Sequence, residues 1–156
     1  MPESSVVFEK YRSKLISLPL TALWRGYGSA IFLEFGDLSP RIGKDGFAGN
    51  PTGNFTVMIE WSWRIENETS IICGSWSDEG NWSSIFEKII GQNVKDVSIH
   101  GRLPEISIRL TNGLYVVSFM TAEDQPSWAI IDNSVDREKP KNLAVRQGVI
   151  VEEFDI

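Results

Sequence analysis

Apolar and polar residues alternate along most of this chain, which is the pattern of half-buried β-strands. The alternation is nearly unbroken over residues 55–65, where every odd position is apolar and positions 56, 60, 62 and 64 are polar. Residues 105–110 alternate too, and Asn112-Gly113 then turns the chain into residues 115–119 as a β-hairpin. Further strands are expected near residues 20–25, 29–36, 69–76, 94–100, 127–132 and 143–152.

Two segments carry a helical period instead. In residues 81–91, Asn81 suits an N-cap, an apolar stripe starts at Trp82, and Gly91 supplies a left-handed stop. Residues 4–16 carry a weaker stripe of the same kind. The sequence therefore predicts an α+β fold that is mostly antiparallel β with two short helices.

The chain shows signs of an internal repeat. The apolar ladder at positions 15, 20 and 23 recurs 74 residues later, and Phe8-Glu9-Lys10 recurs as Phe86-Glu87-Lys88, 78 residues later. A Trp-x-Ile signature occurs at Trp63 and again at Trp128. We expect one domain, residues 1–156, built by internal duplication of a helix plus β-meander, with repeats near 1–77 and 78–156 related by a pseudo-twofold axis. Two layers with both helices on one side are favoured, and a closed or half-open barrel is the alternative.

Residues 37–54 form the one long irregular segment, with four glycines and two prolines. It interrupts a hairpin that the second repeat closes with Asn112-Gly113. Its glycines do not link a strand to a helix, so a dinucleotide or phosphate loop is not indicated. Either it is a recognition loop, with Arg41, Lys44 and Phe47 as contacts, or it is a plain insertion.

Tryptophans supply the other candidate contacts. Trp76 and Trp82 flank the turn 77–81, so we expect both to be partly exposed, with the acids Asp78 and Glu79 beside them. By contrast, Trp61, Trp63 and Trp128 lie on strands, where burial in the core is the default. The alternative for these three is a ligand cleft between the repeats.

Composition and charge exclude several classes. The chain of 156 residues has a net charge of -6 without a basic region, which argues against nucleic-acid and anionic-membrane binding. No apolar run approaches the ~20 residues of a membrane span, and no secretory signal is recognised. Cys73, the single cysteine, is expected to be buried and indicates a reducing, cytoplasmic compartment. His100 is the only histidine, and either Glu34 or Glu60 could be a buried acid.

Three functions follow from these features. The first is a non-enzymatic, cytoplasmic protein-interaction module, such as an immunity or inhibitor protein, because acidic surface and aromatic anchors suit a basic partner. The second is a small-molecule-binding domain with the tryptophan cleft. The third, an enzyme using scattered carboxylates, is least supported, because no motif accompanies the single histidine and cysteine. We predict no catalytic residue, metal or cofactor, and a monomer or homodimer.

Overall fold

The computed structural model describes residues 2–42, 45–123, 126–136 and 139–154 of the chain. In order, the elements are α1 (Pro2–Leu15), β1 (Leu20–Arg25), β2 (Ile31–Phe35), β3 (Phe55–Ile59), β4 (Trp63–Glu66), β5 (Ile71–Gly74), a 3-10 turn (Glu79–Asn81), α2 (Trp82–Ile89), β6 (Val94–His100), β7 (Glu105–Leu110), β8 (Tyr115–Ser118), β9 (Trp128–Asp132), β10 (Lys141–Arg146) and β11 (Val149–Phe154).

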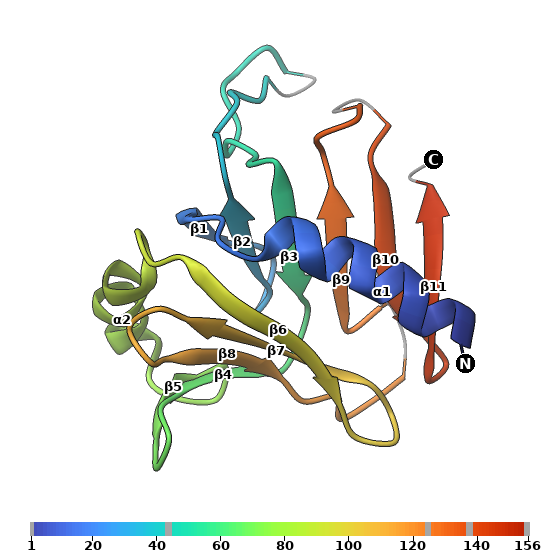
Figure 1. Cartoon of the computed structure of the whole chain (residues 1–156). Coiled ribbons are helices and arrows are strands. Elements are labelled where there is room, and N and C mark those ends of the chain that lie inside the picture. The colour runs from blue at the N-terminus through green and yellow to red at the C-terminus, as the bar shows by residue number, and fades with distance from the viewer. Residues whose placement is uncertain (1, 43–44, 124–125, 137–138, 155–156) are drawn as a thin grey trace.

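The strands form two antiparallel sheets. The first sheet has the order β1-β2-β3-β9-β10-β11, and the second has the order β5-β4-β8-β7-β6. Figure 1 shows that the strands of the two sheets run in markedly different directions. The predicted α+β class, with two short helices and mostly antiparallel strands, is confirmed.

One hydrophobic core fills the space between the sheets. It is built by the alternate residues of each strand that face inward, such as Leu33 and Val57 of the first sheet and Ile65 and Ile108 of the second, all with no exposed surface. Burial of this apolar surface is the main term that stabilises such a domain.

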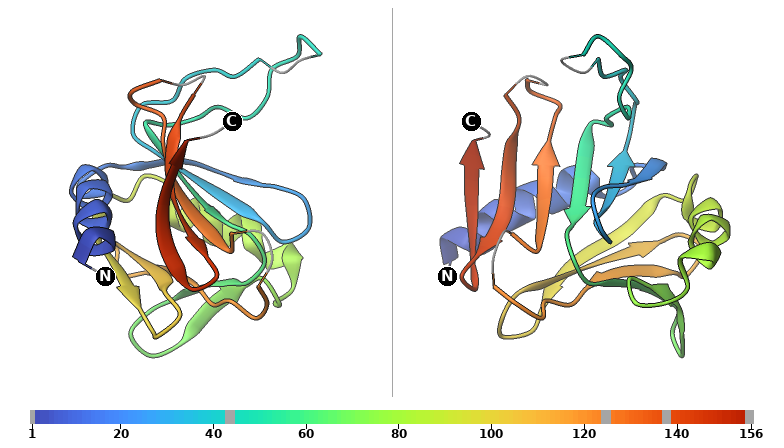
Figure 2. Two further views of the ribbon diagram at one scale, coloured as in Figure 1. Left: turned by 90° about the vertical axis from the view of Figure 1, so that its right-hand side faces the viewer. Right: turned by 180° about the vertical axis from the view of Figure 1, so that it is seen from behind.

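The helices close opposite sides of the two-sheet structure. Helix α1 packs against β6 and β11, which are neighbouring edge strands of the two sheets, whereas α2 packs against the edge strand β5. The Arg25 guanidinium of the edge strand β1 lies 4.5 Å from the ring centroid of Trp82 in α2. The expectation that both helices lie on one side is therefore wrong, because each pair of open edges has its own helix (Figure 2).

The two halves of the chain share one order of elements. In the first, a helix leads into the meander β1-β2-β3 of the first sheet, and β4-β5 then cross to the second sheet. In the second, a helix leads into the meander β6-β7-β8 of the second sheet, and β9-β10 cross to the first, with β11 added. The crossing strands attach in the same way, because β9 pairs with β3 and β4 pairs with β8.

Hydrogen bonds at the junction of the halves follow the predicted offset of 74. The Ser17 amide donates to the Val94 carbonyl (2.8 Å), and the Gly91 amide donates to the Leu20 carbonyl (2.7 Å). The corresponding residues Pro19 and Asn93 form a bridge with each other. The helices also end 74 residues apart, so the Phe-Glu-Lys match at 78 is out of register. These correspondences support the internal duplication, which itself stays a prediction.

Two predicted strands are each divided. Residues 55–65 form β3 and β4, because the chain leaves the first sheet after Ile59 and enters the second at Trp63. Residues 143–152 contain the hairpin between β10 and β11, whose turn residues Gln147 and Gly148 have positive φ of 49° and 77°. A two-residue turn with this twist suits an antiparallel hairpin.

The start of α2 also differs in detail from the sequence expectation. Asn81 occupies the N-cap position, but its side chain makes no capping hydrogen bond. The Asp78 carboxylate instead accepts from the Gly80 amide at the start of the 3-10 turn. Gly91 has a φ of 96°, as a left-handed stop requires.

Candidate functional site

The long segment 37–54, here called the arm, rises from the β2–β3 end of the first sheet and projects beyond it (Figure 1). Ser39 and Thr52 exchange two backbone hydrogen bonds of 2.8 and 3.0 Å, which hold the lower arm as a ribbon. Farther out, Ile42 and Phe47 each expose 74% of their surface. The arm therefore presents apolar side chains on an ordered stem.

A buried polar network fixes the base of the arm. Glu34 of β2 has no exposed surface, and its carboxylate accepts from Trp24 Nε1 (2.7 Å), the Gly53 amide (3.0 Å) and the Thr56 hydroxyl. Asn133 Nδ2 donates to the Gly53 carbonyl (3.2 Å) and to Thr56 Oγ1 (3.0 Å). Because a buried carboxylate needs such partners, these bonds join the arm to β1, β3 and the end of β9.

Glycine is required at position 53. A Cβ there would lie 2.3 Å from the Phe35 carbonyl oxygen, so any side chain would force the arm away from β2. Beside this contact, a cavity of about 540 Å³ lies between the arm and the outer face of the first sheet. Its wall includes Trp24 and Phe32, whose rings stack with centroids 3.9 Å apart.

A second surface lies at the other end of β2. Three aromatic side chains, here called the aromatic end, stand in solvent: Tyr27 is 95% exposed, Trp61 46% and Trp76 81%. They lie in the β1–β2 turn, the β3–β4 junction and the turn after β5. Exposed aromatic side chains on neighbouring loops are typical of interaction surfaces.

Hydrogen bonds hold these three loops side by side. The Ser29 hydroxyl donates to the Trp61 carbonyl (2.6 Å), and Trp63 Nε1 donates to the Ser29 carbonyl (2.7 Å). The Ser75 amide donates to the Trp63 carbonyl (2.9 Å). The backbone that carries the aromatic end is therefore fixed by packed and hydrogen-bonded neighbours.

The aromatic end has an acidic surround. Residues 26–30, 60–62 and 75–81 contain three acids and neither lysine nor arginine. The acids are Glu60, Asp78 and Glu79. Glu79 pairs with Arg25 at 3.0 Å in an exposed salt bridge, which contributes little to stability.

The predicted exposure of Trp82 is wrong. Its side chain is 1% exposed, because Trp82 begins α2 on the apolar stripe of that helix. The indole packs edge-on against Trp63, with centroids 4.9 Å apart, and donates from Nε1 to the Gly74 carbonyl (3.0 Å). Trp82 is thus a core residue that cannot contact a partner.

The other predicted contacts fall into two groups. Trp76, Asp78 and Glu79 lie together at the aromatic end, whereas Arg41 and Phe47 are exposed on the arm. The five residues of β2 separate the two groups by about 17 Å. Lys44 lies outside the described residues. The structure therefore shows two surfaces where the sequence predicted one contact set.

The tryptophans proposed to line a cleft do not meet at one. Trp63 and Trp128 have no exposed surface, so core burial is confirmed for both and an open cleft lined by them is wrong. Both indoles are satisfied inside the protein, since Trp128 Nε1 donates to the Pro104 carbonyl (2.9 Å) as Trp63 does to Ser29. Trp61 is exposed instead, because it sits in the bend between two strands.

Cys73 and Tyr11 are ionisable residues of the hydrophobic core. Cys73 is 3% exposed, and burial raises the pKa of its thiol to about 11, which makes it a poor nucleophile. Burial also raises the pKa of Tyr11, whose hydroxyl donates to Glu152 (2.7 Å). Within the described ranges, no three histidine, cysteine or acidic side chains are placed to hold a metal ion.

No helix in the described part of the chain is long and apolar enough to span a membrane.

The sequence analysis did not identify Trp24, Thr56 and Asn133 as residues at the base of the arm. It did identify Glu34, which lies between apolar neighbours, as a candidate buried acid. Compared with known proteins, the chain matches no family model, no curated protein and no solved structure.

Proposed function

We propose that this protein is a non-enzymatic protein-interaction module, of the immunity or inhibitor type, that binds its partner through the aromatic end. The observation that carries the proposal is the exposure of Tyr27, Trp61 and Trp76 on three adjacent loops. Tryptophan and tyrosine dominate binding energy at protein interfaces because they bury large rigid surfaces at low entropy cost. Leaving three of them in water is otherwise unfavourable.

Charge indicates the kind of partner. The loops of the aromatic end carry three acids and no base, although Glu79 is paired with Arg25 of β1, and the whole chain has a net charge of -6. A positively charged protein surface would be attracted over a distance and orientated by this field. The single cysteine supports a reducing compartment, such as the cytoplasm, as the place of binding.

The arm supplies a second contact region. Its base is fixed by the Glu34 network, so little conformational entropy remains to be lost there on binding. The exposed Ile42 and Phe47 offer apolar anchors. A partner that reaches both surfaces would span the length of β2.

The test begins with the tagged protein isolated gently from its host. Native mass spectrometry then shows whether a second polypeptide accompanies it at fixed stoichiometry. With that partner purified, we expect Trp76→Ala to weaken binding at least ~30-fold, which corresponds to about 2 kcal/mol, the size of an interface hot spot. Val6→Ala removes another exposed apolar side chain, on α1, and should leave the affinity unchanged.

A second variant separates the two surfaces. Replacing residues 36–54 by Thr-Asn-Gly, the turn at 111–113 between β7 and β8, removes the arm and keeps a short hairpin connection. This variant should bind the partner more weakly than the full chain does. Adding Trp76→Ala to it should weaken binding further, by the same factor as in the full chain. A partner that binds both variants as tightly as the unmodified chain contradicts the proposal.

A further inference from the structure

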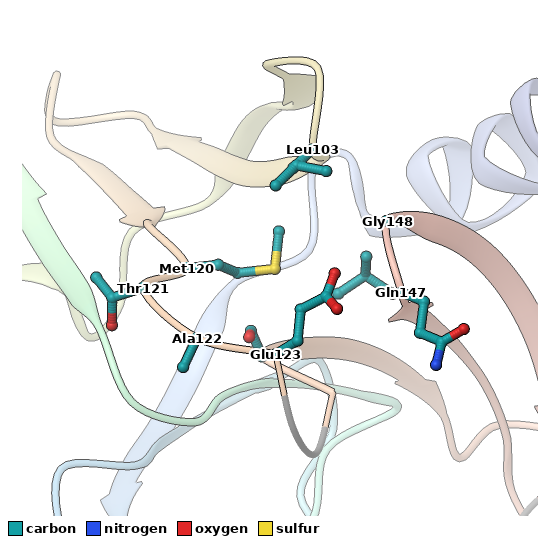
Figure 3. Close-up of a pocket in the computed structure, with 9 residues that line it drawn as sticks. Leu103, Met120, Thr121, Ala122, Glu123, Gln147 and Gly148 are labelled. Carbon is teal, nitrogen blue, oxygen red and sulfur yellow. The ribbon is translucent and has the colours of Figure 1, made fainter.

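A cavity of about 590 Å³ (Figure 3) opens beside the β6–β7 and β10–β11 turns, at the end of the molecule remote from α2 (Figure 1). Its lining comes from the β6–β7 turn, the β8–β9 connection and the β10–β11 hairpin, three segments far apart in the sequence. The volume lies in the range of sites for small organic molecules.

Contacts outside the cavity hold its walls in place. The Glu105 carboxylate accepts from the Met120 amide (2.7 Å) and the Ser118 hydroxyl (2.8 Å), which fixes the start of the β8–β9 connection. The Ser127 carbonyl accepts from the Glu60 amide (2.8 Å), which fixes its end. The hairpin packs closely as well, since a Cβ on Gly148 would lie 3.2 Å from Leu103 Cδ2. These contacts fix the two ends of the β8–β9 connection and the place of the hairpin beside Leu103.

Much of the lining, from Met120 to Ser127 and at Gln147 and Gly148, belongs to features that only one half of the chain has. The β8–β9 connection covers residues 119–127, whereas the corresponding β3–β4 junction needs only residues 60–62. The β10–β11 hairpin extends the first sheet by a strand that the first half does not have. Because the first half forms the same arrangement without these additions, the shared fold does not require them.

The chemistry of the lining selects one class of ligand. Leu103, Met120 and Val145 provide an apolar wall, and Gln147 provides an amide. Among the described residues of the lining, Glu123 is the one with an ionisable side chain, and no hydrogen bond or ion pair joins it to another described residue. In Figure 3 its side chain and those of Leu103 and Met120 converge on the cavity.

We propose that this cavity binds an ammonium or guanidinium group carried on an apolar body, with Glu123 as the counter-ion and Leu103 and Met120 against the apolar part. A charge-assisted hydrogen bond to the carboxylate would orientate the cation. The same chemistry occurs in free organic amines and in the basic side chains of a protein, and the site is separate from the aromatic end.

The test is a titration of the full chain followed by amide chemical shifts in NMR. The probes are phenethylamine, protonated at pH 7, and its neutral analogue 2-phenylethanol. We expect saturable shifts around Leu103 and Gln147 with the amine and much weaker binding of the alcohol. Glu123→Gln should weaken amine binding about tenfold, the value of one charged hydrogen bond, and leave the alcohol unaffected. Leu103→Ala should weaken the binding of both probes.

Glu87→Gln is the matched control, since Glu87 is an exposed acid on α2. Equal amine affinity in the Glu123→Gln and Glu87→Gln variants, or shifts that do not saturate, would overturn the proposal. Lysine and arginine amides with blocked amino termini are the second set of probes. Tighter binding of these than of phenethylamine identifies a protein side chain as the source, and the reverse order identifies a free amine.

Discussion

Replacing Glu34 by alanine tests whether the buried network holds the arm. The carboxylate is fully buried and accepts from the Trp24 indole, the Gly53 amide and the Thr56 hydroxyl. Without it, the buried Gly53 amide and the half-buried Trp24 indole lose their acceptor. The hydroxyl of Thr56 can turn to another acceptor, so two donors remain unsatisfied.

The expected loss follows from these two donors. A buried donor without a partner costs about 1–3 kcal/mol, and the half-buried indole costs less than the buried amide, so the pair costs about 2–5 kcal/mol. Removing a buried charge offsets part of this loss, because the carboxylate no longer has to be desolvated. We expect Glu34→Ala to lower the free energy of unfolding by about 3 kcal/mol, which for a chain of this length lowers Tm by about 6–12 °C.

Urea unfolding followed by tryptophan fluorescence measures this loss. Glu34→Gln keeps the shape and one acceptor oxygen, so its loss should be about half as large. Glu60→Ala, at a half-buried acid in the β3–β4 junction, should change the free energy of unfolding by less than about 0.5 kcal/mol. Amide hydrogen exchange should be faster at Ser39 and Thr52 in Glu34→Ala, because their ribbon is attached to the sheet through the network.

Two results would refute this reasoning. A loss below about 1 kcal/mol in Glu34→Ala would show that the network adds no net stability. If the free energy of unfolding falls by the expected amount but amide hydrogen exchange at Ser39 and Thr52 is unchanged, Glu34 stabilises the sheet without holding the arm.

Two further predictions concern backbone space and pH. Gly53→Ala should destabilise the protein by more than about 2 kcal/mol in urea unfolding, because its Cβ would meet the Phe35 carbonyl, whereas Gly28→Ala, at a φ of 67° with open space around it, should cost about 1 kcal/mol. Burial raises the pKa of Cys73 from 9.0 to about 11, so the folded state holds the thiol proton more tightly than the unfolded state does. The stability that this proton contributes is complete below pH 9 and is lost as the pH rises from about 9 to about 11. The urea midpoint should therefore fall over this range, and it should fall less in Cys73→Ala. An equal fall in both proteins contradicts the assignment, and the raised pKa of Tyr11 leaves a further decline above pH 10 in either case.

Local pattern was sufficient for most elements of the fold. Alternation predicted β7 closely, because every second residue of that strand is buried. Strand β6 was also predicted at residues 94–100, although an irregularity in its register between Val94 and Asp96 breaks the alternation. It failed at residues 55–65, because the alternation continues in phase through the bend between β3 and β4. Only the pairing of Ile59 with Trp128 and of Trp63 with Ser118 shows that the chain has changed sheets.

The candidate site was less predictable because its contacts are long-range. Glu34 stood out as an acid among apolar residues, but its partners Thr56 and Asn133 come from distant parts of the chain, brought together by strand register. The prediction that Trp82 is exposed was wrong, although the sequence contained evidence for its burial. Its position on the apolar stripe of α2 predicted burial, and this signal was stronger than its nearness to a turn.

The differences between the halves coincide with the surfaces to which we assign the proposed function and the proposed ligand. Each half forms a helix, a meander and a crossing hairpin, and the pairing of β3 with β9 and of β4 with β8 shows that these shared parts are enough to join the two sheets. The arm in one half, and the 119–127 connection with β11 in the other, are additions to this plan. The base of the arm is bound to a buried carboxylate, a group that is costly to desolvate and that the corresponding β7–β8 turn does without. An addition that needs its own buried support, yet leaves Ile42 and Phe47 in solvent, is better explained by a contact with another molecule than by the stability of this one.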